Sequence, residues 1–266
     1  MIAVSAAQPA IFVSHGAPTL AIEPSPAREF LAGLGLDVDR RFGRPRAVLV
    51  ASAHWESAVP TVGTAAEFDT IHDFRGFPDE LYRIRYPAHA AQDVARALTE
   101  RLEESGIPAA TDRSRGLDHG AWVPLRLMYP AADVPVVSLS LQPSRGPRHA
   151  YRVGEALRPL RSDGVLVLGS GSITHNLREL SAGQSEEPLH VREFVEWIGA
   201  RAVAADTEAL LDYRRRAPHA ERNHPTDEHL LPLFIVLGVA SPQTPLCRIH
   251  ASRTFGSLRM DAFESS

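Results

Sequence analysis

The chain has 266 residues, of which 44% are hydrophobic and 23% charged, an ordinary composition for a globular protein with a substantial core. Its 28 basic and 32 acidic residues give a formal net charge of −4, which excludes the strong basic field of a nucleic-acid-binding protein. All basic residues are arginine, and the lack of lysine excludes a Schiff-base enzyme, a pyridoxal-phosphate linkage and a Walker P-loop.

The single cysteine and the short apolar runs indicate in which cellular compartment the protein is expected. Cys247 has no partner in the chain for a disulfide, which fits a reducing environment. It stands in the late run PLCRIH, where we expect a strand and a packed thiol rather than a nucleophile. The N-terminus lacks a basic leader region, and no apolar run approaches the roughly 18–20 residues that span a bilayer. We therefore expect a cytoplasmic protein that binds no membrane.

Four short apolar runs predict buried β-strands. They are rich in Val, Ile and Leu without strict alternation, and they are bounded by Pro, Gly or Ser, as is typical of strands covered on both faces. In chain order they occupy residues 10–14, 46–53, 134–141 and 165–170.

Helical patterns lie between and after these runs. Residues 90–106 place Val94, Leu98 and Leu102 on one face and end at Gly106. Similar patterns cover residues 148–161, 189–204 and 226–240. We expect Thr226 to cap the last helix, with acidic residues in its first turn.

Strands that alternate with helices predict an α/β fold. We expect a three-layer α/β/α sandwich around a central sheet that is mostly parallel and mixed at the edge. Residues 246–263 alternate more regularly and predict a final hairpin or edge strands. No repeat or flexible linker divides the sequence, so we expect one catalytic domain over residues 1–266.

Histidines follow three of the predicted strands. His15 and His54 come just after two of them, and His175 comes a few residues after a third. Ligands of open α/β sheets gather where the carboxyl ends of the strands meet. Imidazole is the commonest metal ligand and titrates near neutral pH, so converging histidines indicate a metal site, an acid–base site, or both.

Two further histidines stand in suggestive settings. We expect His119 in a glycine-flanked loop beside Asp118 and Trp122. His229 falls in the first turn of the last predicted helix, where the helix dipole favours a neutral, ligating imidazole. The remaining histidines are expected on the solvated surface, with His72 as the main exception.

Several motifs are absent, and one is incomplete. The sequence contains no H-E-x-x-H, G-x-S-x-G or C-x-x-C. In GSGSIT the third glycine of a dinucleotide fingerprint is replaced by Thr174, which disfavours a phosphate loop. We expect these small residues to let the backbone pass close to a metal or substrate and to let His175 point into the site.

Six segments of the sequence form a recognisable series: FVSHGAP, SAHWES, TIHDFRGFPDELYRIRYPA, GLDHGAWVPLRLMYPAADVPVVSLS, GSGSITHNLREL and PTDEHLLPLFIVLGVA. In the same order they resemble segments of the class III extradiol ring-cleavage dioxygenases, and most of all their 4,5-DOPA dioxygenase-like branch. The resemblance extends over about residues 10–261. It implies a dioxygenase that takes a catechol-type substrate and O₂ and yields a ring-opened semialdehyde.

The resemblance also implies a mononuclear non-haem metal, iron(II) in active members, although zinc can occupy such sites. His15, His54 and His229 match the metal-binding positions. His175 matches a position that is either a further ligand or the catalytic base. His119 matches a pocket histidine with an acid–base or oxygen-stabilising role. The third metal-binding position carries His229, next to Glu228, whereas the best-known extradiol pattern has two histidines and one carboxylate. Because a neutral third ligand eases zinc binding, the sequence leaves iron and zinc as alternative metals.

Other interpretations of the same residues remain. His72, Trp55 and Trp122 are candidates for the aromatic walls of the substrate pocket, with core packing as the alternative for the tryptophans. A zinc-dependent hydrolase could use the same histidines with a metal-bound water. A non-catalytic protein that kept only the pocket is a third hypothesis. The sequence is also compatible with a homo-oligomer.

Overall fold

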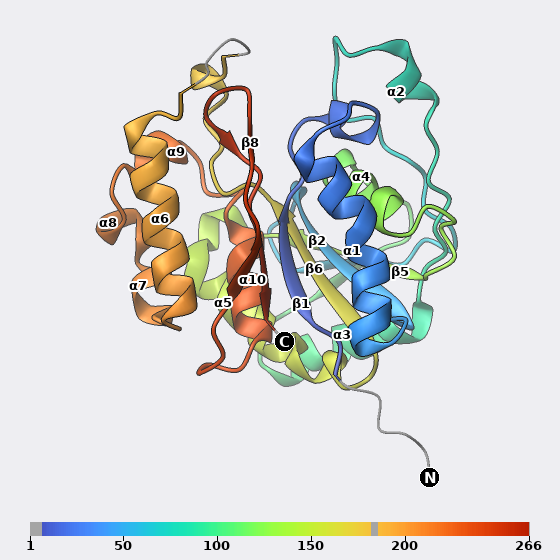
Figure 1. Ribbon diagram of the computed structural model, residues 1–266. Coiled ribbons are helices and arrows are strands. Elements are labelled where there is room, and N and C mark those ends of the chain that lie inside the picture. Colours follow the sequence, from blue (N-terminus) through green and yellow to red (C-terminus); the bar gives the residue numbers. More distant parts are fainter. Residues whose placement is uncertain (1–6, 182–185, 266) are drawn as a thin grey trace.

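The computed structural model describes residues 7–181 and 186–265, which form an α/β fold around one large sheet (Figure 1). Eight strands are ordered β4-β3-β5-β2-β6-β1-β10-β7, and β8 and β9 pair in a separate small sheet. The strands are β1 (Ala10–Ser14), β2 (Ala47–Glu56), β3 (Thr61–Gly63), β4 (Ala110–Asp112), β5 (Val136–Leu141), β6 (Val165–Gly171), β7 (Cys247–His250), β8 (Arg253–Thr254), β9 (Leu258–Arg259) and β10 (Ala262–Ser265).

The four predicted strands form the centre of this sheet. β5, β2, β6 and β1 are neighbours and pair in parallel, and β1, β5 and β6 are buried along their whole length. Because helices cover both faces, these strands carry no alternating polar side. The edges are mixed, since β3 runs antiparallel to β5 and β10 antiparallel to both β1 and β7. The predicted parallel sheet with mixed edges is confirmed.

Helices cover the two faces and complete three layers (Figure 1). One face packs against α1 and α4, and the other against α3, α5, α6 and α10. The helices are α1 (Pro26–Phe42), α2 (Asp79–Arg83), α3 (Gln92–Glu104), α4 (His119–Met128), α5 (Gly146–Leu157), α6 (Leu189–Val203), α7 (Thr207–Leu211), α8 (Tyr213–Arg216), α9 (Ala220–Asn223) and α10 (Leu231–Val239). Short 3₁₀ turns are η1 (Pro18–Ala21), η2 (Pro143–Arg145), η3 (Arg158–Arg161) and η4 (Leu177–Glu179).

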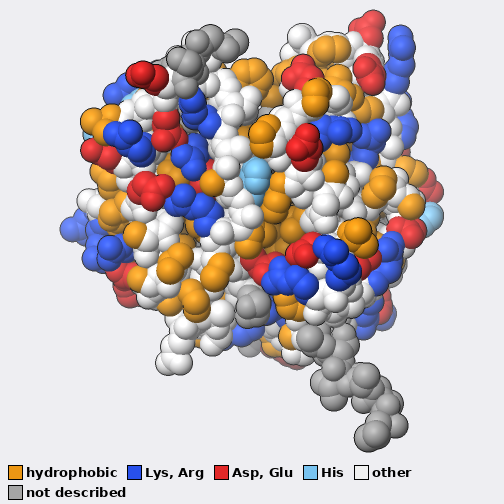
Figure 2. Space-filling model, viewed as in Figure 1, with side chains coloured by type: hydrophobic (Ala, Val, Ile, Leu, Met, Phe, Trp, Pro, Cys, Tyr) orange, Lys and Arg blue, Asp and Glu red, His pale blue; other side chains and the backbone are white. Residues whose placement is uncertain are grey.

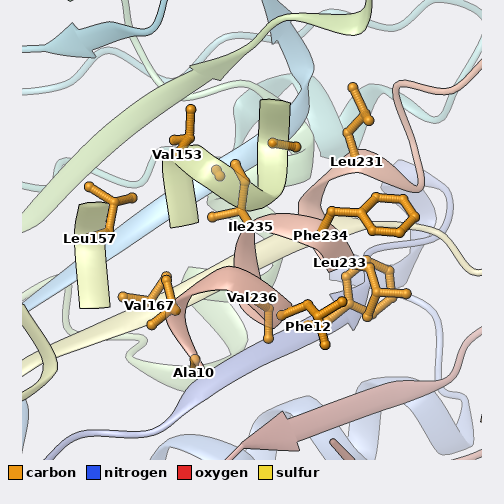
Figure 3. Close-up of a cluster of buried hydrophobic side chains, with 14 of the residues drawn as sticks. Ala10, Phe12, Val153, Leu157, Val167, Leu231, Leu233, Phe234, Ile235 and Val236 are labelled. Atoms are coloured by element: carbon orange, nitrogen blue, oxygen red, sulfur yellow. The ribbon is translucent and has the colours of Figure 1, made fainter. Parts of the chain in front are cut away.

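Helices α5 and α10 meet each other through a pair of glycines. Their apolar side chains share one buried cluster with those of β1 and β6 (Figure 3). A Cβ atom at Gly154 would lie 2.2 Å from the Ile235 carbonyl oxygen, and one at Gly238 would lie 2.0 Å from the Tyr151 carbonyl oxygen. The two backbones therefore meet without intervening side chains. This contact fixes α10, whose N-terminal end leads back to His229.

Three predicted helices match α3, α5 and α6, but the sequence analysis did not predict α1. The Ser25 side chain caps α1 by accepting the Arg28 N–H at 3.2 Å, and Leu31, Leu34 and Val38 bury one face. The expectation of a packed thiol is wrong, because Cys247 lies in edge strand β7 with its side chain exposed. The predicted C-terminal strands are confirmed as the antiparallel pair β10–β7 at one end of the sheet, where β7 is the edge strand.

The surface shows no single-sign charge patch on the face in Figure 2, where acidic and basic side chains are interspersed. This agrees with the small net charge of −4. Within residues 7–181 and 186–265, no helix is both long and apolar enough to cross a membrane.

Candidate metal centre

Three of the predicted histidines lie at the carboxyl ends of neighbouring parallel strands. His15 directly follows β1, and His175 comes shortly after β6. His54 lies inside β2 rather than after it, because β2 continues to Glu56 beyond the residues that pair with β6. The strand order β2-β6-β1 brings these three positions to one edge of the sheet.

The other two histidines reach the same edge from the start of helix α4 and from the turn before helix α10. His119 is the first residue of α4, not a loop residue, because the Asp118 carboxylate caps this helix by accepting a backbone N–H at 3.2 Å. His229 lies in the turn before α10. The predicted cap at Thr226 is wrong, since its hydroxyl donates to Glu228 (3.0 Å) and the helix starts later, at Leu231.

The five histidines converge with their ligand atoms close together. Two groups each have all their ligand atoms within 4.8 Å: His15, His54 and His119, and His175, Glu228 and His229. Nε2 of His54 joins them, lying 3.1 Å from Nε2 of His15 and 3.3 Å from Nε2 of His229. Two nitrogens bound about 2.1 Å from one ion lie about 3.0–3.4 Å apart in right-angled or tetrahedral geometry, so these spacings fit a shared ion.

Each of these three rings has a polar partner near Nδ1, a hydrogen bond for His15 and His229 and a nearby carboxylate for His54. The Ser170 hydroxyl donates its proton to the Gly120 carbonyl oxygen, so it accepts the Nδ1–H of His15 (3.0 Å). Nδ1 of His229 lies 2.9 Å from a Glu228 carboxylate oxygen, and Nδ1 of His54 lies 3.3 Å from an Asp73 oxygen. With the protons on Nδ1, three Nε2 lone pairs face one another. A divalent cation removes this repulsion, so the donor set fits a metal.

Burial and mutual repulsion keep these imidazoles neutral. Burial is the largest influence and lowers the pKa of His15 and His229 well below the ordinary value. The neighbouring histidines lower both further. Burial, followed by repulsion from His119, lowers the pKa of His54 to about 3. Neutral imidazole is the form that binds a metal.

His175 stacks on His229, with ring centroids 3.3 Å apart and planes at 10°. Its backbone N–H donates to the Asn223 carbonyl oxygen at 2.8 Å, and its Nδ1 lies 3.9 Å from Glu228. Burial lowers the pKa of His175, although the Glu228 charge acts in the opposite direction. His175 is therefore a neutral group with a carboxylate near enough to stabilise its cation.

His119 is anchored by a residue that sequence reasoning missed. One carboxylate oxygen of Asp73 accepts both the backbone N–H of His119 (3.0 Å) and its Nδ1–H (2.9 Å). Burial acts to raise the pKa of Asp73, but the hydrogen bonds from His119 lower it to about 2. The only local signal was a carboxylate directly after His72 in the sequence.

The glycines of GSGSIT serve a different purpose from the expected one. A Cβ atom at Gly171 would lie 2.1 Å from the His229 carbonyl oxygen, and one at Gly169 would lie 2.5 Å from the Pro232 carbonyl oxygen. They admit the backbone around His229 against β6 rather than a ligand. Gly120 plays a similar part within the cluster, because its Cβ would come 2.9 Å from His54 Cδ2 and 3.1 Å from His15 Cε1.

Two of the predicted wall residues lie on one side of the cluster. The half-buried ring of His72 lies 6.0 Å from the indole of Trp122. Trp122 is fully buried, and its indole N–H donates to the Ile71 carbonyl oxygen at 3.0 Å. With no exposed surface, Trp122 supports the segment that carries His72 and Asp73 and does not form a pocket wall itself.

Trp55 follows His54 in β2, so strand alternation directs the two side chains to opposite faces of the sheet. The Trp55 ring lies 5.5 Å from the Arg115 guanidinium. The structure therefore does not bring Trp55 to the histidines. Instead Phe74, which the sequence analysis did not single out, lies edge-on to His119 with centroids 5.8 Å apart.

A small cavity opens beside His15 and His175. Its remaining lining is largely apolar and comprises Gly16, Ala17, Ser172, Leu177, Leu180, Phe255 and Leu258. The expectation of solvated histidines elsewhere is wrong for His149, His190 and His224, which are buried.

Comparisons with known proteins agree with this geometry. Residues 9–257 match the family described as the catalytic LigB subunit of aromatic ring-opening dioxygenase. Proteins named 4,5-DOPA dioxygenase extradiol from Beta vulgaris and Mirabilis jalapa are 38% and 39% identical over 255 and 244 residues. These alignments cover 95% and 91% of this chain and 94% and 90% of those proteins.

The crystal structure of an uncharacterized protein from Escherichia coli K12 matches with a TM-score of 0.80 and 30% identity. The match covers 97% of this chain and 100% of that one. The resemblance predicted from the six sequence motifs is thereby confirmed. The chain belongs to the LigB family of aromatic ring-opening dioxygenases.

Proposed function

We propose that the protein is an extradiol dioxygenase that uses O₂ to open the ring of a catechol-type substrate, DOPA-like or related, giving a semialdehyde. In this proposal His15, His54 and His229 hold one divalent metal, iron(II) for activity, and zinc can occupy the same site. The observation that carries it is the convergence of the Nε2 atoms of three buried or half-buried histidines at the sheet edge in a chain of this family.

The bound metal would supply positive charge that lowers the pKa of the two substrate hydroxyls. His175 is neutral at neutral pH, so it can accept a hydroxyl proton, and Glu228 stabilises the resulting cation. His119 donates its Nδ1–H to Asp73, which leaves Nε2 as the atom that exchanges a proton or hydrogen-bonds to oxygen. His175 is placed here as base, with a fourth ligand as its alternative role.

The cavity beside His15 and His175 suits an aromatic ring. Leu177, Leu180 and Phe255 offer apolar walls and exclude water from the ring. The proposed ligands are spread from residue 15 to residue 229, so we also infer that the chain acts as one catalytic domain.

Anaerobic reconstitution with iron(II), followed by oxygen electrode measurements with a panel of catechols, tests the proposal. We expect one O₂ consumed per catechol and a yellow ring-opened product from at least one member of the panel. Zinc-loaded protein should consume no O₂, because zinc has no redox chemistry. If the iron(II) protein consumes no O₂ with any catechol, the proposal is wrong.

A further inference from the structure

Asp73 lies between two histidines to which different roles are proposed, one a metal ligand and the other an acid–base group. One carboxylate oxygen faces Nδ1 of His54 at 3.3 Å. The other accepts the backbone N–H and the Nδ1–H of His119, at 3.0 and 2.9 Å. The two imidazole rings are adjacent, with centroids 4.0 Å apart.

We propose that Asp73 is a positioning residue that couples the orientation of His54 to that of His119, using one carboxylate oxygen for each ring. The roles of the two histidines rest on the proposed function, whereas the contacts of Asp73 do not. Rotation of the carboxylate would move both rings together. Metal binding and the placement of the acid–base group would therefore depend on the same side chain.

The segment that carries Asp73 is held by the helix that begins with His119. The Ile71 carbonyl oxygen accepts the Trp122 indole N–H (3.0 Å), and the Ile71 N–H donates to the Leu117 carbonyl oxygen (2.8 Å). Both partners flank His119 in the sequence. The carboxylate and its target ring therefore belong to one packed unit, and His54 is attached to that unit from β2.

Donor and acceptor chemistry shows why a carboxylate is needed at this position. His119 presents two N–H donors to one oxygen, and an asparagine Oδ1 could accept both. The asparagine amide would then place its own N–H donors against the Nδ1–H of His54. A flipped amide would instead place its N–H donors against the backbone N–H and the Nδ1–H of His119, so that two hydrogen bonds would be lost rather than one contact. Asparagine can therefore support His119 but not His54.

Glu228 on the opposite side has a weaker version of this arrangement. The same oxygen lies 2.9 Å from Nδ1 of His229 but 3.9 Å from Nδ1 of His175, beyond hydrogen-bond distance. The close two-ring contact is thus a particular feature of Asp73. We call the two contacts of Asp73 the His54 arm and the His119 arm. Mutation can separate them, because asparagine can support His119 but not His54.

The experiment compares Asp73→Asn and Asp73→Ala with the wild-type protein. The matched control is Glu193→Gln, which alters an exposed carboxylate 2.8 Å from the His219 ring. Zn²⁺ affinity of the metal-free protein is measured by competition with a chromogenic chelator. Both Asp73 variants should bind Zn²⁺ about 10- to 100-fold more weakly, the usual effect of removing a carboxylate behind a histidine ligand, and the control should match the wild type.

The His119 arm is measured at saturating iron(II). We expect Asp73→Asn to keep kcat within about tenfold of the wild type and Asp73→Ala to lose about 100-fold, mainly in kcat rather than KM. The double variant Asp73→Ala/His119→Ala should be no slower than Asp73→Ala alone, because both changes remove one function. NMR of the zinc-loaded protein should show the His119 Nδ1–H signal in the wild type and in Asp73→Asn, but not in Asp73→Ala.

Unchanged Zn²⁺ affinity in Asp73→Asn would overturn the His54 arm. The His119 arm would be overturned if the kcat loss of the double variant equalled the product of the two single losses. A His119 Nδ1–H signal that persists in Asp73→Ala would also overturn it. If Asp73→Ala does not fold, Asp73→Asn still tests both arms, because loss of its His119 Nδ1–H signal would also overturn the His119 arm. A wild-type protein that consumes no O₂ contradicts the proposed function only, because the zinc and NMR measurements need no turnover.

Discussion

Acidification should destabilise the metal-free protein through the histidines of the cluster, His15, His54 and His229. Burial and mutual repulsion lower the pKa of each, that of His54 to about 3, so the folded protein keeps them neutral. In the unfolded chain histidines titrate near 6.5. Below that pH the unfolded state binds protons that the folded state does not, so stability is present above 6.5 and is lost as the pH falls.

The size of the effect follows from this linkage. A histidine with an unfolded pKa of about 6.5 that stays neutral when folded lowers the free energy of unfolding by about 2 kcal/mol at pH 5. Three such residues lower it by about 6 kcal/mol, which is comparable to the whole stability of a typical domain. A metal ion at about 1,000 times its Kd raises the free energy of unfolding by about 4 kcal/mol, because it binds only the folded state.

Urea unfolding of the metal-free protein between pH 7 and 5 measures this dependence. His229→Gln removes one titrating group, so its slope of stability against pH should be shallower by up to about 1.4 kcal/mol per pH unit. His89→Gln, a change at an exposed histidine outside the cluster, serves as the control and should keep the wild-type slope. Equal slopes for His229→Gln and the wild type would refute the assignment of a neutral, buried cluster.

Further substitutions test the individual parts of the site. His15→Ala should abolish zinc binding in an equilibrium assay, and metal content equal to the wild type would show that it is no ligand. His119→Ala should keep the metal but lower kcat about 100-fold, and an unchanged kcat would remove it from the acid–base chemistry. Gly120→Ala should weaken zinc binding, because its Cβ would come 2.9 Å from His54 Cδ2, and retained affinity would contradict this close packing. Glu228→Gln should weaken zinc binding about tenfold through the ligand it orients, and no change would argue against that contact.

The central sheet could be predicted from sequence because its signal is local. Four runs of Val, Ile and Leu without alternation became β1, β2, β5 and β6, the parallel strands covered on both faces. The same positions located His15 and His175, since a histidine after a buried strand must emerge at the sheet edge. Helix α1 was also marked in the sequence, by Ser25 before Pro26 and by apolar residues in helical spacing.

Other features depend on contacts that the sequence does not display. Helix α4 contains Pro124 and buries nearly every residue, so it lacks the amphipathic pattern that marks a helix. The hydrogen bond from His119 to Asp73 joins residues 46 positions apart. The late start of α10 reflects a hydroxyl of Thr226 that bonds to Glu228 rather than to the backbone. Spacing rules carry no information about such partners.

Isotope labelling tests the central claim most directly. The iron(II)-reconstituted protein is given one catechol and ¹⁸O₂, and the product is reduced with borohydride at once and analysed by mass spectrometry. The proposed dioxygenase incorporates both ¹⁸O atoms, one of them in the new carboxylate. A product that carries no label from ¹⁸O₂, or one formed equally well without oxygen, would contradict the account.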